Sequence, residues 1–165
     1  MNVSNIRSRR RVVTITSAIV MVASVLVGCT AQHVEEGKPS MDPDVAKQKM
    51  IDAVNDVIGR LGGQWKPRTG PDAPESCQLS NGQKGAHWVY LTGSADGGDP
   101  EPDAAATKKL WRSQGMAVER WADPDGPVIV GRGGGSVDSI NLYAFPGNYT
   151  VEAISLCFPG DADRL

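Results

Sequence analysis

The chain has 165 residues, with 17 basic and 19 acidic side chains, two histidines, three cysteines and a formal net charge of −2. This mild acidity disfavours nucleic acid as a partner, and it also disfavours a polybasic grip on anionic lipid. The length is that of one ordinary domain that can bury its own core.

The first 28 residues have the organisation of an export signal. Four arginines between positions 7 and 11 precede an uncharged stretch of 16 residues, 12–27. At roughly 1.5 Å per residue this stretch would span about 24 Å as a helix, which is short for a hydrocarbon core of about 30 Å. A signal peptide therefore fits better than a membrane span, and an uncleaved signal anchor is the alternative.

Leu26-Val27-Gly28-Cys29 closes this stretch and resembles a bacterial lipobox. In proteins with this motif a diacylglyceryl group is attached to the cysteine sulfur, and a signal peptidase then cuts directly before it. The resemblance implies cleavage between Gly28 and Cys29, acyl chains such as palmitate on Cys29, and attachment to the outer face of the plasma membrane. Two acyl chains suffice for stable anchoring, since each buried CH₂ contributes about 0.8 kcal/mol. Cleavage removes four arginines and no acid, so the net charge becomes −6.

The lipobox also simplifies the cysteine count. With Cys29 taken up by lipid, Cys77 and Cys157 remain as a candidate disulfide in an oxidising envelope. Two free buried thiols and a metal pair are the alternatives. Two sulfurs without nearby histidines make a poor zinc site, so the disulfide is the prediction.

Residues 29–41 are mostly polar and include Gly37 and Pro39, which predicts a flexible tether with a reach of roughly 20 Å. A single globular domain is expected from residue 42 to residue 165. It begins with Asp42 as a helix N-cap and Pro43 at the first helical position. Gly62-Gly63 ends this helix, and its apolar stripe consists of Met50, Val54, Val57 and Leu61.

The middle of the chain alternates turns with regular elements. Residues 64–68 predict a short strand broken by Pro67, and residues 70–76 predict a turn-rich loop. Residues 87–92 are rich in aromatic and β-branched side chains and predict a strand. A second helix is expected from Pro102 to about Gln114, with Gly115 as its cap.

The last third of the chain predicts four strands separated by short turns, at residues 117–122, 127–131, 137–145 and 149–158. Short turns between consecutive strands imply antiparallel pairing. The order of elements therefore predicts an α+β domain, with an antiparallel sheet of about five to six strands and two helices packed on one face.

Residues 131–136, Gly-Arg-Gly-Gly-Gly-Ser, invite comparison with a phosphate-binding loop. Such a loop needs a lysine and a following helix N-terminus, whereas a strand is expected here. A hairpin turn is therefore the better interpretation, with Arg132 at its tip available to an anionic ligand.

Few side chains suggest catalysis. His87 is the histidine that a Ser-His-Asp triad would have to use, and no serine lies in a nucleophile-elbow motif. The acid pairs Asp96/Asp99 and Glu101/Asp103 could do glycosidase work, but acids beside glycine and proline more often cap helices and turns. No cluster has metal-ligand spacing. The side chains thus indicate no catalytic residue, cofactor or metal.

The chain has four tryptophans: Trp65, Trp88, Trp111 and Trp121. They could stack on sugars or lipids, although core packing is expected for at least two of them.

The whole chain resembles the small mycobacterial lipoproteins of the LppA/LppB type, on Arg9-Arg10-Arg11, Leu26-Val27-Gly28-Cys29, Gly62-Gly63-Gln64-Trp65 and Ser155-Leu156-Cys157. The resemblance implies an envelope lipoprotein and brings no catalytic residues. We therefore expect a non-catalytic binding or accessory domain, anchored to the plasma membrane through Cys29, whose partner is an envelope protein or a small ligand. The alternative is an envelope hydrolase acting on cell-wall sugar or lipid.

Overall fold

The computed structural model describes residues 41–165. The expected signal peptide, the cleavage site at Gly28 and Cys29, and the tether up to residue 40 lie outside the described residues. The elements, in chain order, are α1 (Pro43–Leu61), β1 (Lys66–Gln78), β2 (Lys84–Ser94), α2 (Pro100–Ser113), β3 (Met116–Asp123), β4 (Gly126–Gly133), β5 (Ser139–Phe145), β6 (Asn148–Ile154), β7 (Phe158–Pro159) and a 3₁₀ turn at Ala162–Arg164.

The first helix begins and ends as the sequence predicts. Asp42 Oδ1 accepts hydrogen bonds from the backbone N–H groups of Asp44 at 2.9 Å and Val45 at 3.2 Å. Gly62 ends the helix at φ 69°, where a side chain would be strained. Met50, Val54 and Val57 of the predicted apolar stripe are buried at 1% exposure or less, together with Ala46, whereas Leu61 is half-buried.

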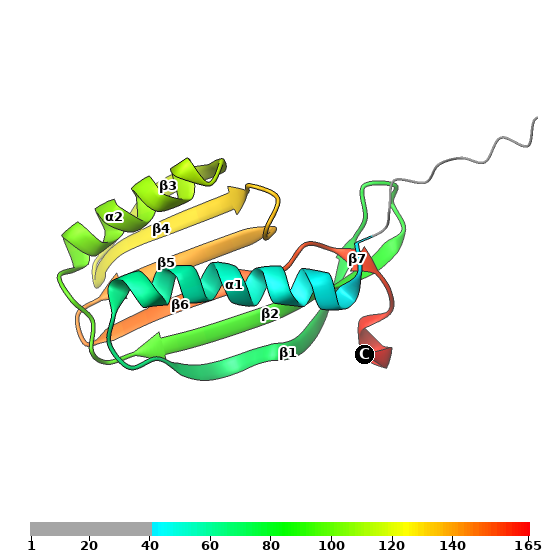
Figure 1. The fold of residues 1–165 in the computed structure, drawn as a ribbon, viewed down its shortest axis with the longest axis horizontal. Helices are drawn as coiled ribbons and strands as arrows, with labels where there is room; N and C mark the ends of the chain where they lie inside the picture. The colour runs from blue at the N-terminus through cyan, green and yellow to red at the C-terminus, as the bar shows by residue number, and fades with distance from the viewer. Residues whose placement is uncertain (1–40) are drawn as a thin grey trace, which may run out of the picture. The chain divides into compact units, whose positions relative to one another are not determined.

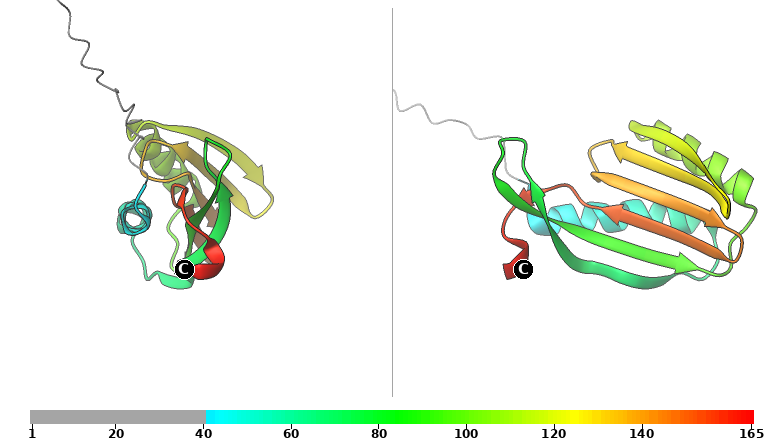
Figure 2. Two further views of the ribbon diagram at one scale, coloured as in Figure 1. Left: turned by 90° about the vertical axis from the view of Figure 1, so that its right-hand side faces the viewer. Right: turned by 180° about the vertical axis from the view of Figure 1, so that it is seen from behind.

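The six longer strands form one antiparallel sheet in the order β1-β2-β6-β5-β4-β3, and the short β7 pairs with β2. Both helices lie on the same face of this sheet (Figure 1). Helix α1 packs over β2 and β6, and α2 packs over β3, β4 and β5. Seen from behind, the strands stand in front of both helices (Figure 2). The predicted α+β class and the position of the helices are confirmed.

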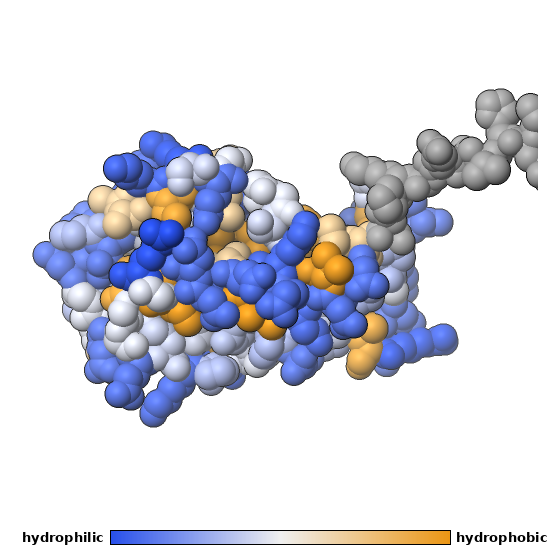
Figure 3. Space-filling model, viewed as in Figure 1, coloured by the Kyte–Doolittle hydropathy of each residue, from blue (hydrophilic) through white to orange (hydrophobic). Residues whose placement is uncertain are grey.

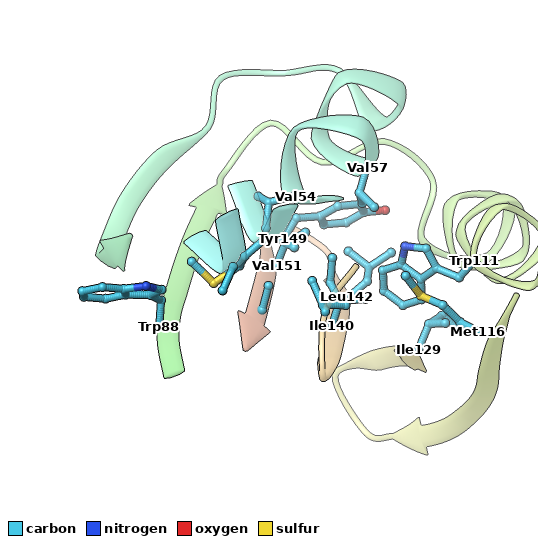
Figure 4. Close-up of a cluster of buried hydrophobic side chains, with 14 of the residues drawn as sticks. Val54, Val57, Trp88, Trp111, Met116, Ile129, Ile140, Leu142, Tyr149 and Val151 are labelled. Atoms are coloured by element: carbon cyan, nitrogen blue, oxygen red, sulfur yellow. The ribbon is translucent and has the colours of Figure 1, made fainter. Parts of the chain in front are cut away.

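The core fills the space between this sheet face and the two helices (Figure 4). Side chains alternate between the two faces of a strand, so every second residue of β5 and β6 points toward the helices. The register places Leu142 of β5 beside Val151 of β6 and Ile129 of β4. All three are fully buried, as are Ile140 and Tyr149.

The prediction of a short strand at residues 64–68 and a turn-rich loop at residues 70–76 is wrong, because the structure has a single strand, β1, in this region. It runs for 13 residues along the sheet edge, and it holds Pro67, Pro71 and Pro74. An edge strand tolerates proline because the N–H groups on its outer side have no ladder partner. Register shifts between Pro67 and Thr69, and between Thr69 and Ala73, absorb the irregular backbone.

The last predicted strand, residues 149–158, is wrong in its second half because β6 ends at Ile154. The Ser155 hydroxyl accepts a hydrogen bond from the Trp88 backbone N–H at 2.9 Å, so a side chain takes the place of a ladder carbonyl. The chain then passes Cys157 and rejoins the sheet as β7. Helix α2 also begins at Pro100, two residues before the predicted Pro102.

The predicted disulfide between Cys77 and Cys157 is present, with the two Cα atoms 6.1 Å apart. It joins the end of β1 to the link between β6 and β7, and it passes over Gly85 of β2. A Cβ at Gly85 would come within 2.7 Å of Cys157 Sγ and 3.3 Å of Cys77 Sγ. The disulfide therefore links the edge strand β1 to the C-terminal segment of the chain.

The described residues, 41–165, belong to one compact unit that holds both helices, the strands and the disulfide. We therefore expect this segment to fold on its own. Among residues 41–165, no helix has the length and apolarity needed to cross a membrane.

Candidate functional site

A groove of about 420 Å³ lies between the two helices. Helix α1 contributes Val57, Arg60 and Leu61 to one wall. Helix α2 contributes side chains spaced three and four residues apart to the other wall, including Asp103, Ala106, Thr107, Leu110 and Ser113. The volume falls within the range of small-molecule binding sites, roughly 300–1,000 Å³.

The groove lies between two helices that pack over different strands, α1 over β2 and β6 and α2 over β3, β4 and β5. At one end Gln114, which follows α2, donates a hydrogen bond to Asp56 of α1 at 2.8 Å. At the other end the α1 cap approaches the loop after β2, since a Cβ at Gly63 would lie 2.8 Å from the Asp96 carbonyl oxygen. These contacts lie next to lining residues of the groove, Gln114 beside Ser113 of α2 and Asp56 beside Val57 of α1.

The walls are apolar and the rim is basic. Val57, Leu61 and Leu110 provide aliphatic surface, and Arg60 and Lys109 border it. In Figure 3, apolar residues are exposed between the helices and hydrophilic residues surround them. A groove of this kind suits a ligand with an apolar body and a polar end.

Beneath the groove, the Tyr149 hydroxyl donates a hydrogen bond to Asp103 Oδ2 at 2.9 Å. The Tyr149 ring is fully buried and lies under α1, with its oxygen beside Val57 (Figure 4). Burial raises the pKa of Tyr149 far above its ordinary value, and the hydrogen bond and charge of Asp103 raise it further. Tyr149 therefore stays protonated and fixes the orientation of the Asp103 carboxylate.

Two glycines of the loop after β2 make room for this pair. A Cβ at Gly97 would lie 2.3 Å from the Tyr149 ring, and a Cβ at Gly98 would lie 2.8 Å from Asp103 Oδ2. The loop backbone can therefore close against both side chains because neither glycine carries a side chain.

We expect Tyr149→Phe to lower the free energy of unfolding by about 2 kcal/mol, because it removes a hydrogen bond to a charged group. Tyr143→Phe is the matched control. The Tyr143 hydroxyl lies 3.5 Å from Glu152 Oε2, a longer contact on the helix-free face, so its loss should cost less than about 0.5 kcal/mol. Urea unfolding of both variants measures the difference, and equal losses would contradict the role given to Tyr149.

The structure does not bring the predicted catalytic candidates together. His87 lies opposite Glu75 in the β1–β2 register, with Nε2 3.7 Å from Glu75 Oε2. Alternation along β2 places it on the face opposite Trp88, away from the helices. Asp103 does line the groove.

Among the other predicted acids, the carboxylate of Glu101 has a structural partner. Glu101 accepts a hydrogen bond from Arg120 at 2.7 Å, and this bond and the charge of Glu101 raise the pKa of Arg120. Asp99 is the N-cap residue of α2, but its side chain makes no capping hydrogen bond. The Asp96 backbone N–H donates to Ser94 Oγ at 3.0 Å. Within residues 41–165, no group of three or more histidine, cysteine, aspartate or glutamate side chains could hold a metal ion.

The glycine-rich segment forms the predicted turn between β4 and β5 at residues 134–136. Arg132 is exposed but is not at the tip of this turn as predicted, because β4 extends to Gly133 and pairs Arg132 with Ala117 and Ser139. The tryptophans divide by burial: Trp88 and Trp111 belong to the core, Trp65 packs partly against it, and Trp121 is 52% exposed. Core packing of at least two tryptophans is confirmed.

Sequence reasoning missed the groove residues Arg60, Ala106, Lys109 and Leu110. The sequence gives only a weak indication of these residues. The helical spacing of Asp103, Ala106 and Leu110 shows that they share one face of a helix, but it does not show which element lies opposite that face. The opposite wall comes from residues more than 40 positions earlier.

No family model and no curated protein sequence matches this chain. A solved structure of a DUF4853 family protein from Actinomyces odontolyticus is similar in fold, with a TM-score of 0.52 at 15% sequence identity. The similarity covers 76% of this chain and 72% of that chain. At this level of identity it supports the fold alone.

Proposed function

We propose that this protein is a cell-envelope lipoprotein whose domain is a non-catalytic binding module, with the groove between α1 and α2 as its ligand site. The lipid on Cys29 would hold it at the outer face of the plasma membrane, and the tether would let the domain reach a ligand nearby. The observation that carries the binding role is the open groove of about 420 Å³ between the two helices, with aliphatic side chains on both walls.

A binding role also agrees with the chemistry of the groove walls. The titratable side chains that line them are Arg60, Lys109 and Asp103, and Asp103 is already engaged by Tyr149. A hydrolase would need a general acid and a base or nucleophile placed on either side of a substrate bond. Arg60 and Lys109 are cations suited to contact with an anion, which favours recognition over acid–base chemistry.

The anchor is tested by Cys29→Ala in a bacterial host. The variant should accumulate as an unprocessed, lipid-free precursor, because the acyl chains are attached to the cysteine sulfur before cleavage. Mass spectrometry of the membrane fraction measures both the mass of the N-terminus and the acyl content. Cys77→Ala is the matched control and should be lipidated and cleaved as the wild type is. Normal processing of Cys29→Ala would exclude the lipobox.

The binding site is tested with N-phenyl-1-naphthylamine, a neutral apolar dye whose fluorescence rises in apolar surroundings. Residues 36–165 should bind it, and Ala106→Trp should abolish binding because the indole fills the groove. Ala105→Trp is the matched control, since Ala105 is the adjacent exposed alanine of α2 but does not line the groove. Absence of dye binding, or equal loss in both variants, would overturn the proposed site.

A further inference from the structure

We infer that the natural ligand of this groove is an anionic amphiphile with a single apolar chain, whose carboxylate or phosphate contacts Arg60 and Lys109. The inference rests on the proposed binding function and adds the chemical class of the ligand. It is argued from the charges at the rim, the free donors of the two cations and the shape of the apolar walls.

The two cations at the rim retain donors for a ligand. The Nε of Arg60 donates to Asp56 Oδ1 at 3.0 Å, which leaves the two terminal nitrogens of the guanidinium for another acceptor. Asp56 is shared, because its Oδ2 accepts from Gln114. Within residues 41–165, Lys109 forms no ion pair. A fork of donors and a point charge on opposite walls suit a carboxylate or phosphate.

Asp103, the acidic side chain that lines the groove, does not make a cationic ligand more suitable than an anionic one. Asp103 is in the first turn of α2, six residues before Lys109, which is about 9 Å along the helix. Its carboxylate already accepts the Tyr149 hydrogen bond. An anionic head between Arg60 and Lys109 is thus set apart from Asp103, whereas a cation would meet both positive side chains at the rim.

The walls suit an apolar chain in extended form. The lining side chains of α2 run from Asp103 to Ser113, a length of about 15 Å at 1.5 Å per residue. Leu61 and Leu110 provide aliphatic surface on the two walls, with the buried Val57 beneath them, and Ala106 is a small side chain between them. One chain fits such a slot, and it binds through burial of its methylene groups.

Competition with the bound dye tests the inference. Dodecanoate and dodecyl phosphate should displace N-phenyl-1-naphthylamine from residues 36–165 at about tenfold lower concentration than dodecanol, which has the same chain and no charge. The double variant Arg60→Gln/Lys109→Gln should reduce this advantage to about twofold. Lys108→Gln is the matched control on the same helix and should keep it. Raising the salt concentration should shrink the wild-type advantage, because exposed charges are screened.

Methyl-labelled NMR spectra locate the binding. Titration with dodecyl phosphate should shift the methyl signals of Val57, Leu61 and Leu110 and leave those of Val89 and Ile154, on the opposite sheet face, unchanged. Equal displacement by dodecanol, or an anionic advantage that survives the double substitution, would overturn the inference. The proposed function would still stand in that case if the dye bound and Ala106→Trp excluded it.

Discussion

Replacement of both Cys77 and Cys157 with alanine is expected to lower the free energy of unfolding by roughly 4.5 kcal/mol. The bridge joins residues 80 positions apart, and the chain-entropy model assigns about this value to a loop of that length. Domains of this size have a total stability of about 5–15 kcal/mol. We therefore expect the variant to keep little of its stability.

The disulfide has a particular mechanical role in this sheet. Strand β1 is an edge strand with three prolines and two register shifts, so part of its ladder with β2 is missing. The link after β6 likewise leaves the sheet at Ser155 before β7 rejoins it. The bridge joins the regularly paired end of β1, residues 73–78, to this link, so its loss should release the link from the sheet edge.

Urea unfolding of residues 36–165 measures the effect. Wild-type protein unfolded with a reductant should match the double alanine variant, because both lack the bridge. Ser76→Ala, adjacent to Cys77, controls for a change in β1 that leaves the disulfide intact. A loss below about 1 kcal/mol in the double variant would contradict the loop-closure argument.

Local chemistry made much of the fold predictable. Asp42, Pro43 and Gly62 specify the limits of α1 because capping depends on neighbours in the chain. The same locality explains the correct turns between the last strands. It also explains the error at β1, where proline argues against a strand unless that strand lies at an edge, and edge position is a property of the whole sheet.

The candidate site was less predictable, because its walls meet only in the folded chain. The sequence identifies Asp103 as one of several acids before α2, but its partner Tyr149 lies 46 residues later on another element. Arg60 and Lys109 are ordinary helix cations when each helix is considered separately. The spatial relation between them follows from β6 lying between β2 and β5, which separates the two helices across the sheet.

Trp111→Ala should destabilise the domain by about 3–5 kcal/mol, the cost of truncating a large aromatic side chain in a core. Trp111 is 1% exposed, and a Cβ at Gly131 of β4 would lie 2.9 Å from its ring. Figure 4 shows it among Met116, Ile129 and Leu142. The alanine variant therefore leaves a cavity between α2 and the sheet that the surrounding side chains fill only in part.

Trp121→Ala is the matched control for this prediction, because the same side chain is removed from the opposite environment. Trp121 is 52% exposed on the edge strand β3, and its Nε1 donates to Glu119 Oε2 at 3.1 Å on the surface. Its loss should change the free energy of unfolding by less than about 0.5 kcal/mol. Urea unfolding of both variants checks the contrast. Comparable losses would mean that Trp121 is covered in solution by a partner, whereas a small loss for Trp111 would mean that α2 does not pack on the sheet as described.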